Sequence, residues 1–178
     1  MLFRSQGLSF ARRGQLLTDT LAACRVLWRD TPANFSSPTV AFRETYLEPK
    51  PLQPGGVPLW IAGTLHNRNL DRVVRFGDAW IPIMGETVEG IGAGVQRIRD
   101  ALVAAHRDPS SFQVQAPLRI EKGETGRPDL ARSIESVPEL LAVGATDVHV
   151  TLRAFAADVE DAPQAMRELR RRFDDLAL

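Results

Sequence analysis

The chain has 178 residues, of which 44% are hydrophobic and 25% are charged. This length predicts one domain with enough chain to form a core, and the composition is that of an ordinary soluble protein. Lys plus Arg and Asp plus Glu both number 22, so the formal net charge is zero. This balance excludes the overall basic character of a typical nucleic-acid binder, and we expect no nucleic-acid partner.

The chain contains one cysteine, Cys24, which excludes an intramolecular disulfide and fits a reducing cytoplasm. Cys24 falls in an apolar helical pattern, which favours a small buried side chain over a nucleophile. No apolar run reaches the length of a membrane span, and the first residues lack the apolar core of a signal peptide. We therefore expect a cytoplasmic protein that does not engage a membrane.

The first third of the chain combines one helix with an irregular segment. Residues 15–28 carry apolar side chains at helical spacing, which predicts a helix with a wide buried face. From Asn34 to Gly56 the pattern breaks up among Ser, Pro and Thr, and we expect a short hairpin followed by extended, proline-rich chain. Because no flexible linker appears, we predict a single domain over residues 1–178, with residues 30–56 as an irregular insertion before the first strand.

Apolar runs and helical patterns alternate along the rest of the chain. Val57–Ala62 is a nearly all-apolar run, typical of a strand buried on both faces. Three more strands are predicted at 79–84, 112–120 and 147–152, and helices at 67–76, 88–106, 136–144 and from 161 onward. Ser136 and Asp161 are the expected caps of the last two helices. The alternation predicts an α/β fold with a parallel sheet of βα units, forming a small open sheet or part of a barrel.

In parallel α/β folds, ligands bind beyond the carboxyl ends of the strands. Gly63 and Thr64 follow the first strand. Gly63 would allow a backbone to approach a ring or a phosphate, and Thr64 offers a hydroxyl and an amide before a helix. Gly63 also suits a tight turn with no ligand, and composition alone favours that interpretation. Further candidate loops lie at 82–85, 121–126 and 153–156.

Other polar and aromatic residues favour structural roles. Trp80 lies inside an apolar strand, where a core position is favoured over a platform for ligand stacking. His66, His106 and His149 have no carboxylate or cysteine at metal-ligand spacing, so no metal site is predicted. The run Arg170–Arg172 is interpreted as a solvated helix face, since acidic residues follow it.

Several of these segments resemble the luciferase-like monooxygenase superfamily of flavin- or coenzyme F-420-dependent oxidoreductases. The segments are Gly7–Gly14 before the first helix, Leu47–Gly63 with its Trp-Ile strand, Gly77–Trp80, and the helix-to-strand turn Gly144–Val150. They cover nearly the whole chain in the family's order. Ala62 and Ala79 stand where the family usually has glycine, and both are small enough to preserve a backbone that approaches a ligand.

The resemblance implies a TIM barrel, of which this chain supplies only a C-terminal half of about four strands. A complete barrel has eight strands and typically ~250 residues. The resemblance also implies FMN or coenzyme F-420 as cofactor, without deciding between them. It assigns no catalytic residue. The expected cofactor contacts are Ile61, Ala62, Gly63 and Thr64, with Trp80 and Arg12 as further candidates.

We therefore expect part of an oxidoreductase or monooxygenase that acts on a small organic substrate and is incomplete alone. The cofactor would supply the redox chemistry, and the protein would supply orientation and electrostatics. The alternative is a non-catalytic pseudoenzyme or assembly module that retains half of the barrel. Four strands cut from a barrel leave two edges and an inner face uncovered, so we expect a homodimer or association with a missing N-terminal half.

Overall fold

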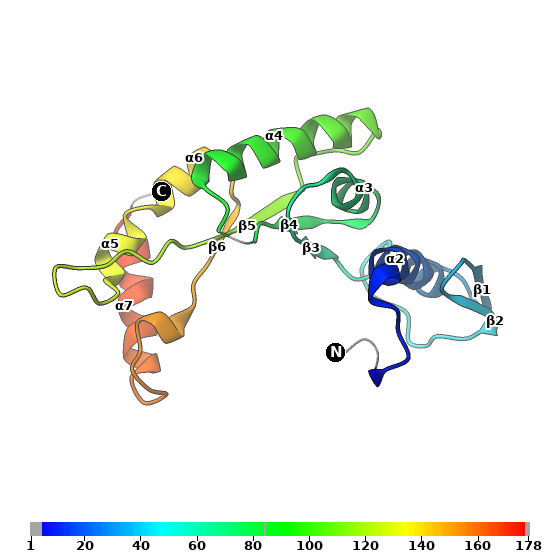
Figure 1. Ribbon diagram of the computed structural model, residues 1–178, viewed down its shortest axis with the longest axis horizontal. Helices are drawn as coiled ribbons and strands as arrows, with labels where there is room; N and C mark the ends of the chain where they lie inside the picture. The colour runs from blue at the N-terminus through cyan, green and yellow to red at the C-terminus, as the bar shows by residue number, and fades with distance from the viewer. Residues whose placement is uncertain (1–4, 84, 177–178) are drawn as a thin grey trace. The chain divides into compact units, whose positions relative to one another are not determined.

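The computed structural model describes residues 5–83 and 85–176, and the chain divides into two compact units with the boundary between Leu59 and Trp60 (Figure 1). The N-terminal unit holds one long helix and a hairpin, and the C-terminal unit holds a parallel sheet with its helices. Met84, the predicted end of the second sheet strand, lies outside the described residues. That residues 1–178 act as a single domain stays a prediction.

The N-terminal unit is built around its long helix, which buries Leu21 and Ala23. The predicted hairpin is confirmed: two short strands pair antiparallel, and the rings of Phe35 and Phe42 lie 5.8 Å apart across them. The elements of this unit are η1 (Phe10–Arg12), α2 (Arg13–Arg29), β1 (Ala33–Ser36) and β2 (Ala41–Thr45).

A buried carboxylate joins the hairpin to α2. Asp19 is only 6% exposed, and it accepts hydrogen bonds from Thr39 Oγ1 at 2.6 Å and from Gln15 Nε2 at 2.7 Å. The hydrogen bond from Thr39 is the main reason why the pKa of Asp19 lies below the ordinary value of an aspartate, although burial opposes the shift. The ionised form of Asp19 therefore stabilises the attachment of the hairpin.

The C-terminal unit contains the predicted parallel sheet, in the order β3-β4-β5-β6 (Figure 1). All three neighbouring pairs are parallel, because a helical connection after each strand returns the chain to the end of the sheet at which the next strand begins. The elements of this unit are β3 (Trp60–Ala62), α3 (Asn67–Phe76), β4 (Ala79–Ile81), α4 (Val88–Ala104), β5 (Gln113–Pro117), α5 (Leu130–Ile134), α6 (Val137–Ala142), β6 (Asp147–His149), η2 (Leu152–Ala154) and α7 (Ala162–Asp174).

The expectation that Val57–Ala62 is a strand buried on both faces is wrong. The strand begins only at Trp60, and Trp60 and Ala62 are exposed while Ile61 between them is buried. Side chains alternate between the faces of a strand, so Ile61 packs on the helix side and its two neighbours belong to the other face. The apolar run therefore reflects a strand with one covered and one exposed face.

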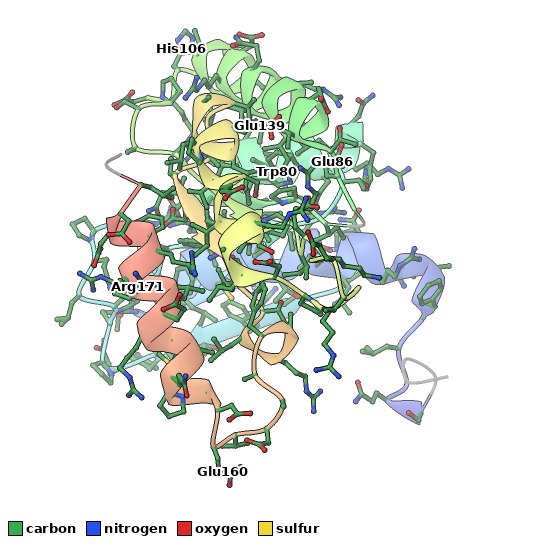
Figure 2. All side chains as sticks on the ribbon, turned by 90° about the vertical axis from the view of Figure 1, so that its left-hand side faces the viewer. Trp80, Glu86, His106, Glu139, Glu160 and Arg171 are labelled. Carbon is green, nitrogen blue, oxygen red and sulfur yellow. The ribbon has the colours of Figure 1, made fainter. Side chains whose placement is uncertain are left out.

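Trp80 is the largest side chain in the core of the C-terminal unit, with 1% of its surface exposed. It lies in β4 among the side chains between the sheet and α4, and Figure 2 also shows His106 just beyond the end of that helix. The ring fits because α4 has a glycine opposite it: a Cβ at Gly94 would lie 2.6 Å from Trp80 Cη2. The predicted core position of Trp80 is confirmed.

Ser136 and Asp161 are the N-cap residues of α6 and α7, as predicted, but neither side chain caps its helix. The Ser136 hydroxyl donates to the Ser133 carbonyl at 2.7 Å instead of accepting from the helix that follows. The reason is a short helix that the sequence pattern did not reveal, α5, which ends two residues earlier and leaves Ser136 in a helical conformation. Asp161 is likewise helical in its backbone and makes no side-chain cap.

None of the helices formed by the described residues is long and apolar enough to cross a membrane.

Two glycines of α4 provide a matched test of the packing around Trp80. Gly94→Ala would press its methyl against the indole, and overpacking of this kind should lower the free energy of unfolding by about 1–3 kcal/mol. The new methyl group of Gly90→Ala would meet only the Glu86 side chain, which is flexible and can move aside, and the gain in helix propensity should raise that free energy by ~0.5–1 kcal/mol. Urea unfolding followed by tryptophan fluorescence measures both, and equal effects would contradict the packing described.

Asp19 predicts how stability depends on pH. Because its pKa is lower in the folded chain than in the unfolded chain, the unfolded chain takes up the proton first as the pH falls. The stability that Asp19 contributes is therefore complete above about pH 4 and is lost below it. Asp19→Asn should flatten this part of the pH profile in urea unfolding between pH 3 and pH 7, and an unchanged slope would contradict the role of the carboxylate.

Candidate functional site

The turn from β3 to α3, residues 62–66, lies at the carboxyl end of the parallel sheet. β3 ends at Ala62, and His66 is the N-cap of α3. Ala62 and Thr64 are exposed, and Gly63 between them is half-buried. The turn thus presents its backbone and one hydroxyl group to solvent at the edge where parallel α/β sheets bind ligands.

Gly63 has a backbone conformation that only glycine adopts readily. Its φ is +128°, and its amide donates to the Ile81 carbonyl at 3.1 Å. A Cβ at this position would lie 3.0 Å from Asn69 Nδ2. The turn therefore needs this glycine for structural reasons, and the contact of Gly63 with a ligand stays a prediction.

Three successive amide groups of the turn, those of Thr64, Leu65 and His66, donate to no acceptor within residues 5–83 and 85–176. The Thr64 hydroxyl also has no partner in the described part of the chain. These donors lie just before α3, whose dipole has its positive end there. Such an arrangement suits an anionic group, for example a phosphate.

Ile61 and Trp80, the other predicted cofactor contacts in the C-terminal unit, are buried, in contrast to the exposed backbone of the turn. Ile61 is 7% exposed and packs beside Gly77, so its side chain faces α3. Trp80 is buried, but its indole Nε1 donates to the Gly63 carbonyl at 2.8 Å. The structure therefore brings residues 61–64 together in one strand and turn, and it connects Trp80 to them through a backbone carbonyl.

Arg12, the remaining predicted contact, belongs to the N-terminal unit. It is exposed, and its Nη2 donates to the Pro38 carbonyl at 2.9 Å. This hydrogen bond joins the start of α2 to the loop between β1 and β2. A role of Arg12 toward a cofactor stays a prediction.

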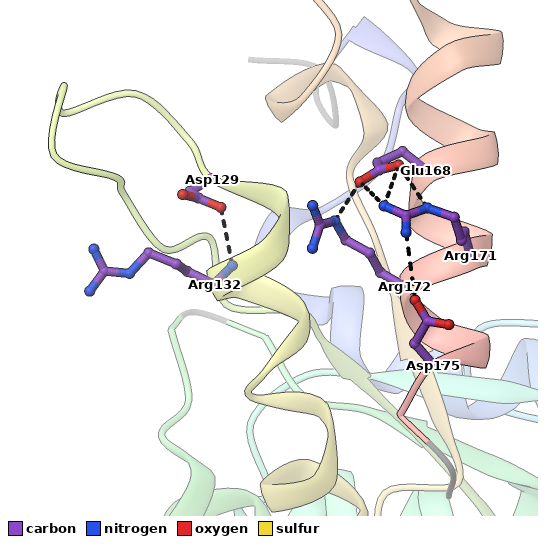
Figure 3. Close-up of polar contacts among 6 residues, drawn as sticks. All are labelled: Asp129, Arg132, Glu168, Arg171, Arg172 and Asp175. Carbon is purple, nitrogen blue, oxygen red and sulfur yellow. Dashed lines mark hydrogen bonds and ion pairs between the residues drawn. The ribbon is translucent and has the colours of Figure 1, made fainter.

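The arginine run on α7 is paired along its own helix, in agreement with its interpretation as a solvated face. Figure 3 shows Glu168 between two arginines, with distances of 2.8 Å to Arg171 Nη2 and 2.6 Å to Arg172 Nε. Arg171 also lies 3.8 Å from Asp175. The hydrogen bond from Arg171 holds the pKa of Glu168 below its usual value. These arginines are therefore compensated on their own helix.

Of the three histidines, His66 has a local structural role, and His106 and His149 lie at the ends of other elements. His66 caps α3, since its Nδ1 accepts from the backbone N–H of Asn69 at 3.3 Å. His106 follows α4 with a φ of +55°, and His149 is exposed at the end of β6. In the part of the chain that the structure describes, no three His, Cys, Asp or Glu side chains gather as metal ligands.

Three polar residues that support the turn were not predicted from the sequence. Asn69 and Arg72 are buried in α3, with 5% and 7% exposed, and Arg97 reaches the turn from α4. Asn69 shares the buried face of α3 with Val73 and Phe76. An asparagine on the apolar stripe of a short helix was the available signal, because a buried amide needs hydrogen-bond partners.

A family model described as luciferase-like monooxygenase matches residues 2–175. The phthiodiolone/phenolphthiodiolone dimycocerosates ketoreductase of Mycobacterium tuberculosis is 27% identical over 134 residues, which are 74% of this chain and 34% of that protein. An uncharacterized protein of the same species is 29% identical over 102 residues, 57% of this chain and 35% of its own length. The chain thus spans about a third of the length of these curated relatives.

Solved structures share the fold at low identity. The monooxygenase RslO1 from Streptomyces bottropensis superposes with a TM-score of 0.59 at 16% identity, over 98% of this chain and 53% of that one. An F420-dependent secondary alcohol dehydrogenase, solved with an F420–acetone adduct, gives a TM-score of 0.54 at 15% identity, over 92% and 55%. With four parallel strands and no closure among the described residues, the prediction of a partial barrel is confirmed.

Two glycines test the strain at the turn. Gly63→Ala introduces both a disfavoured φ and a close contact with Asn69, so it should lower the free energy of unfolding by about 2–3 kcal/mol. Gly126→Ala, at a φ of +75° with nothing within 4 Å of the new methyl, should cost only ~1 kcal/mol. Urea unfolding of both variants measures the difference, and equal losses would contradict the contact with Asn69.

Proposed function

Because the chain belongs to the luciferase-like monooxygenase family, we propose that it forms part of a flavin- or coenzyme F-420-dependent oxidoreductase or monooxygenase acting on a small organic substrate. The observation that carries this proposal is the turn at residues 62–66, with three amides and the Thr64 hydroxyl directed at no group of the described chain. Both cofactors carry phosphate, which such donors bind well.

In this proposal the chain binds and orients the cofactor. The bound flavin or deazaflavin supplies the hydride chemistry. Thr64 and the amides of the turn hold the phosphate, and the backbone at Ala62 and Gly63 approaches the rest of the cofactor because neither residue carries a bulky side chain. Ile61 supports the strand from the helix side, where it is buried.

The proposal also includes a partner for the open sheet face. Trp60 and Ala62 on β3, Pro117 on β5 and His149 on β6 are exposed. β3 and β6 each pair with a single neighbour in the described chain, so both edges carry unpaired backbone groups that can accept another strand. A second copy of this chain, or the half of the barrel that the four strands lack, would cover both features.

Cofactor titration tests the proposed function. The chain should quench the fluorescence of FMN and of coenzyme F-420, or of one of them, and it should bind riboflavin more weakly than FMN because riboflavin lacks the phosphate. Thr64→Val should weaken FMN binding about tenfold through loss of a hydrogen bond to a charged group, and leave riboflavin binding nearly unchanged.

Thr20→Val is the matched control, because Thr20 is also an exposed threonine but lies on α2, outside the candidate loops at the carboxyl end of the sheet, and it should not change the affinity. If neither cofactor binds to the chain at any oligomeric state it reaches, the oxidoreductase proposal is wrong. The alternative of a non-catalytic assembly module that retains the fold would then account for the chain.

Light scattering after size-exclusion chromatography tests the partner. We expect a homodimer, and Trp60→Glu should shift it toward the monomer because a charge on the open sheet face opposes burial. Val103→Glu, at an exposed position on α4, is the matched control and should leave the dimer intact. A wild-type chain that is monomeric would contradict the homodimer.

A further inference from the structure

The turn after β3 has four successive backbone carbonyls that each accept a hydrogen bond from a side chain. Asn69 Nδ2 donates to the carbonyls of Ala62, at 3.4 Å, and Thr64, at 3.2 Å. Trp80 Nε1 donates to the Gly63 carbonyl at 2.8 Å, and Arg97 Nη1 donates to the Leu65 carbonyl. The donors come from α3, β4 and α4, so three elements hold this one turn.

Two of these donors are buried, which makes their arrangement specific. Trp80 is 1% exposed and Asn69 is 5% exposed. A buried amide or indole N–H that lacked an acceptor would destabilise the fold, so neither donor can turn away without loss. Arg72 Nη1 lies 3.5 Å from Asn69 Oδ1 and orients the amide of Asn69 with its nitrogen toward the turn.

The geometry of the peptide bond converts this arrangement of carbonyls into an arrangement of amides. In a trans peptide, the C=O of one residue and the N–H of the next point in opposite directions. Holding the carbonyls of residues 63, 64 and 65 toward the side chains of Trp80, Asn69 and Arg97 therefore directs the N–H groups of Thr64, Leu65 and His66 away from these side chains. These are the same three amides that have no acceptor in the described chain.

We propose that Asn69, Trp80 and Arg97 are positioning residues that set the peptide planes of the turn and aim its three free amides outward. Their consequence for cofactor affinity rests on the proposed function, but their effect on the turn does not. This assigns Trp80 an indirect role through the Gly63 carbonyl. It also assigns a role to Asn69, which the apolar stripe of α3 singles out, and to Arg97, whose place in the sequence pattern indicates none.

The first test measures the turn itself. The Gly63 amide donates to Ile81, so its hydrogen exchange reports local opening of the turn. Arg97→Met removes the hydrogen bonds of an exposed side chain to the Leu65 carbonyl and to Asn67 Oδ1 at the start of α3. It should speed this exchange about tenfold or more, because the loss of a single hydrogen bond corresponds to about tenfold. Arg97→Lys retains a charged donor for the Leu65 carbonyl and should restore much of the protection.

Arg107→Met is the matched control. Arg107 also donates to two backbone carbonyls, at 2.6 Å to Val74 and 2.9 Å to Gly77, but at the other end of α3. Arg107→Met should leave the hydrogen exchange of the Gly63 amide near the wild-type rate. The positioning role is wrong if Arg97→Met and Arg107→Met change this rate equally, or if Arg97→Met does not change it.

The buried donors are tested by Asn69→Leu and Trp80→Phe, which should speed the exchange of the Gly63 amide more than Arg97→Met does. If either variant fails to fold, Arg97→Met decides the question alone, because its side chain is exposed. FMN titration is the second readout: the Kd for FMN should rise several-fold in Arg97→Met but not in Arg107→Met. If the wild-type chain binds no FMN, the proposed function fails, and the exchange rates still decide the positioning role.

Discussion

The hydrogen bond from the Trp80 indole to the Gly63 carbonyl joins the core of the C-terminal unit to the turn that carries its candidate site. The indole can lie there only because α4 has Gly94 opposite the ring, and the turn can form only because Gly63 accepts a positive φ. Packing of the core and the geometry of the site are thus one constraint. A substitution at Gly94 on α4, the third element after the turn, should therefore change the geometry of residues 62–66.

The open face of the sheet gives the second constraint. Helices cover one face, where Ile61, Trp80 and Val114 are buried in register, while Trp60 and Ala62 on the other face are exposed. The solved structures with this fold extend well beyond the part that this chain covers. The match covers only 53% of RslO1, for example. The proposed partner would cover the open face, and the proposed cofactor would bind at the carboxyl end of the same sheet.

Much of the fold could be predicted from the sequence, since it depends on local patterns. Helical spacing predicted α2, α3 and α4, and the alternation of apolar runs predicted a parallel sheet. The short helix α5 escaped prediction because five residues carry too little periodicity to be recognised. The motifs at Ser136 and Asp161 marked the starts of α6 and α7 correctly, but their side chains do not cap these helices. Side-chain capping requires an extended backbone at the N-cap residue, and both residues are helical because of the element that precedes them.

By itself, the sequence determined the family, the order of the elements and the glycine that ends the first sheet strand, because each is written in residues close together along the chain. Only the tertiary structure decided how that glycine is held. Trp80 and Arg97 lie 17 and 32 residues from their carbonyl partners, and their convergence with Asn69 requires α3, β4 and α4 to pack around one turn. Hydrogen bonds between separate elements have no periodicity, so a pattern along the chain does not reveal them.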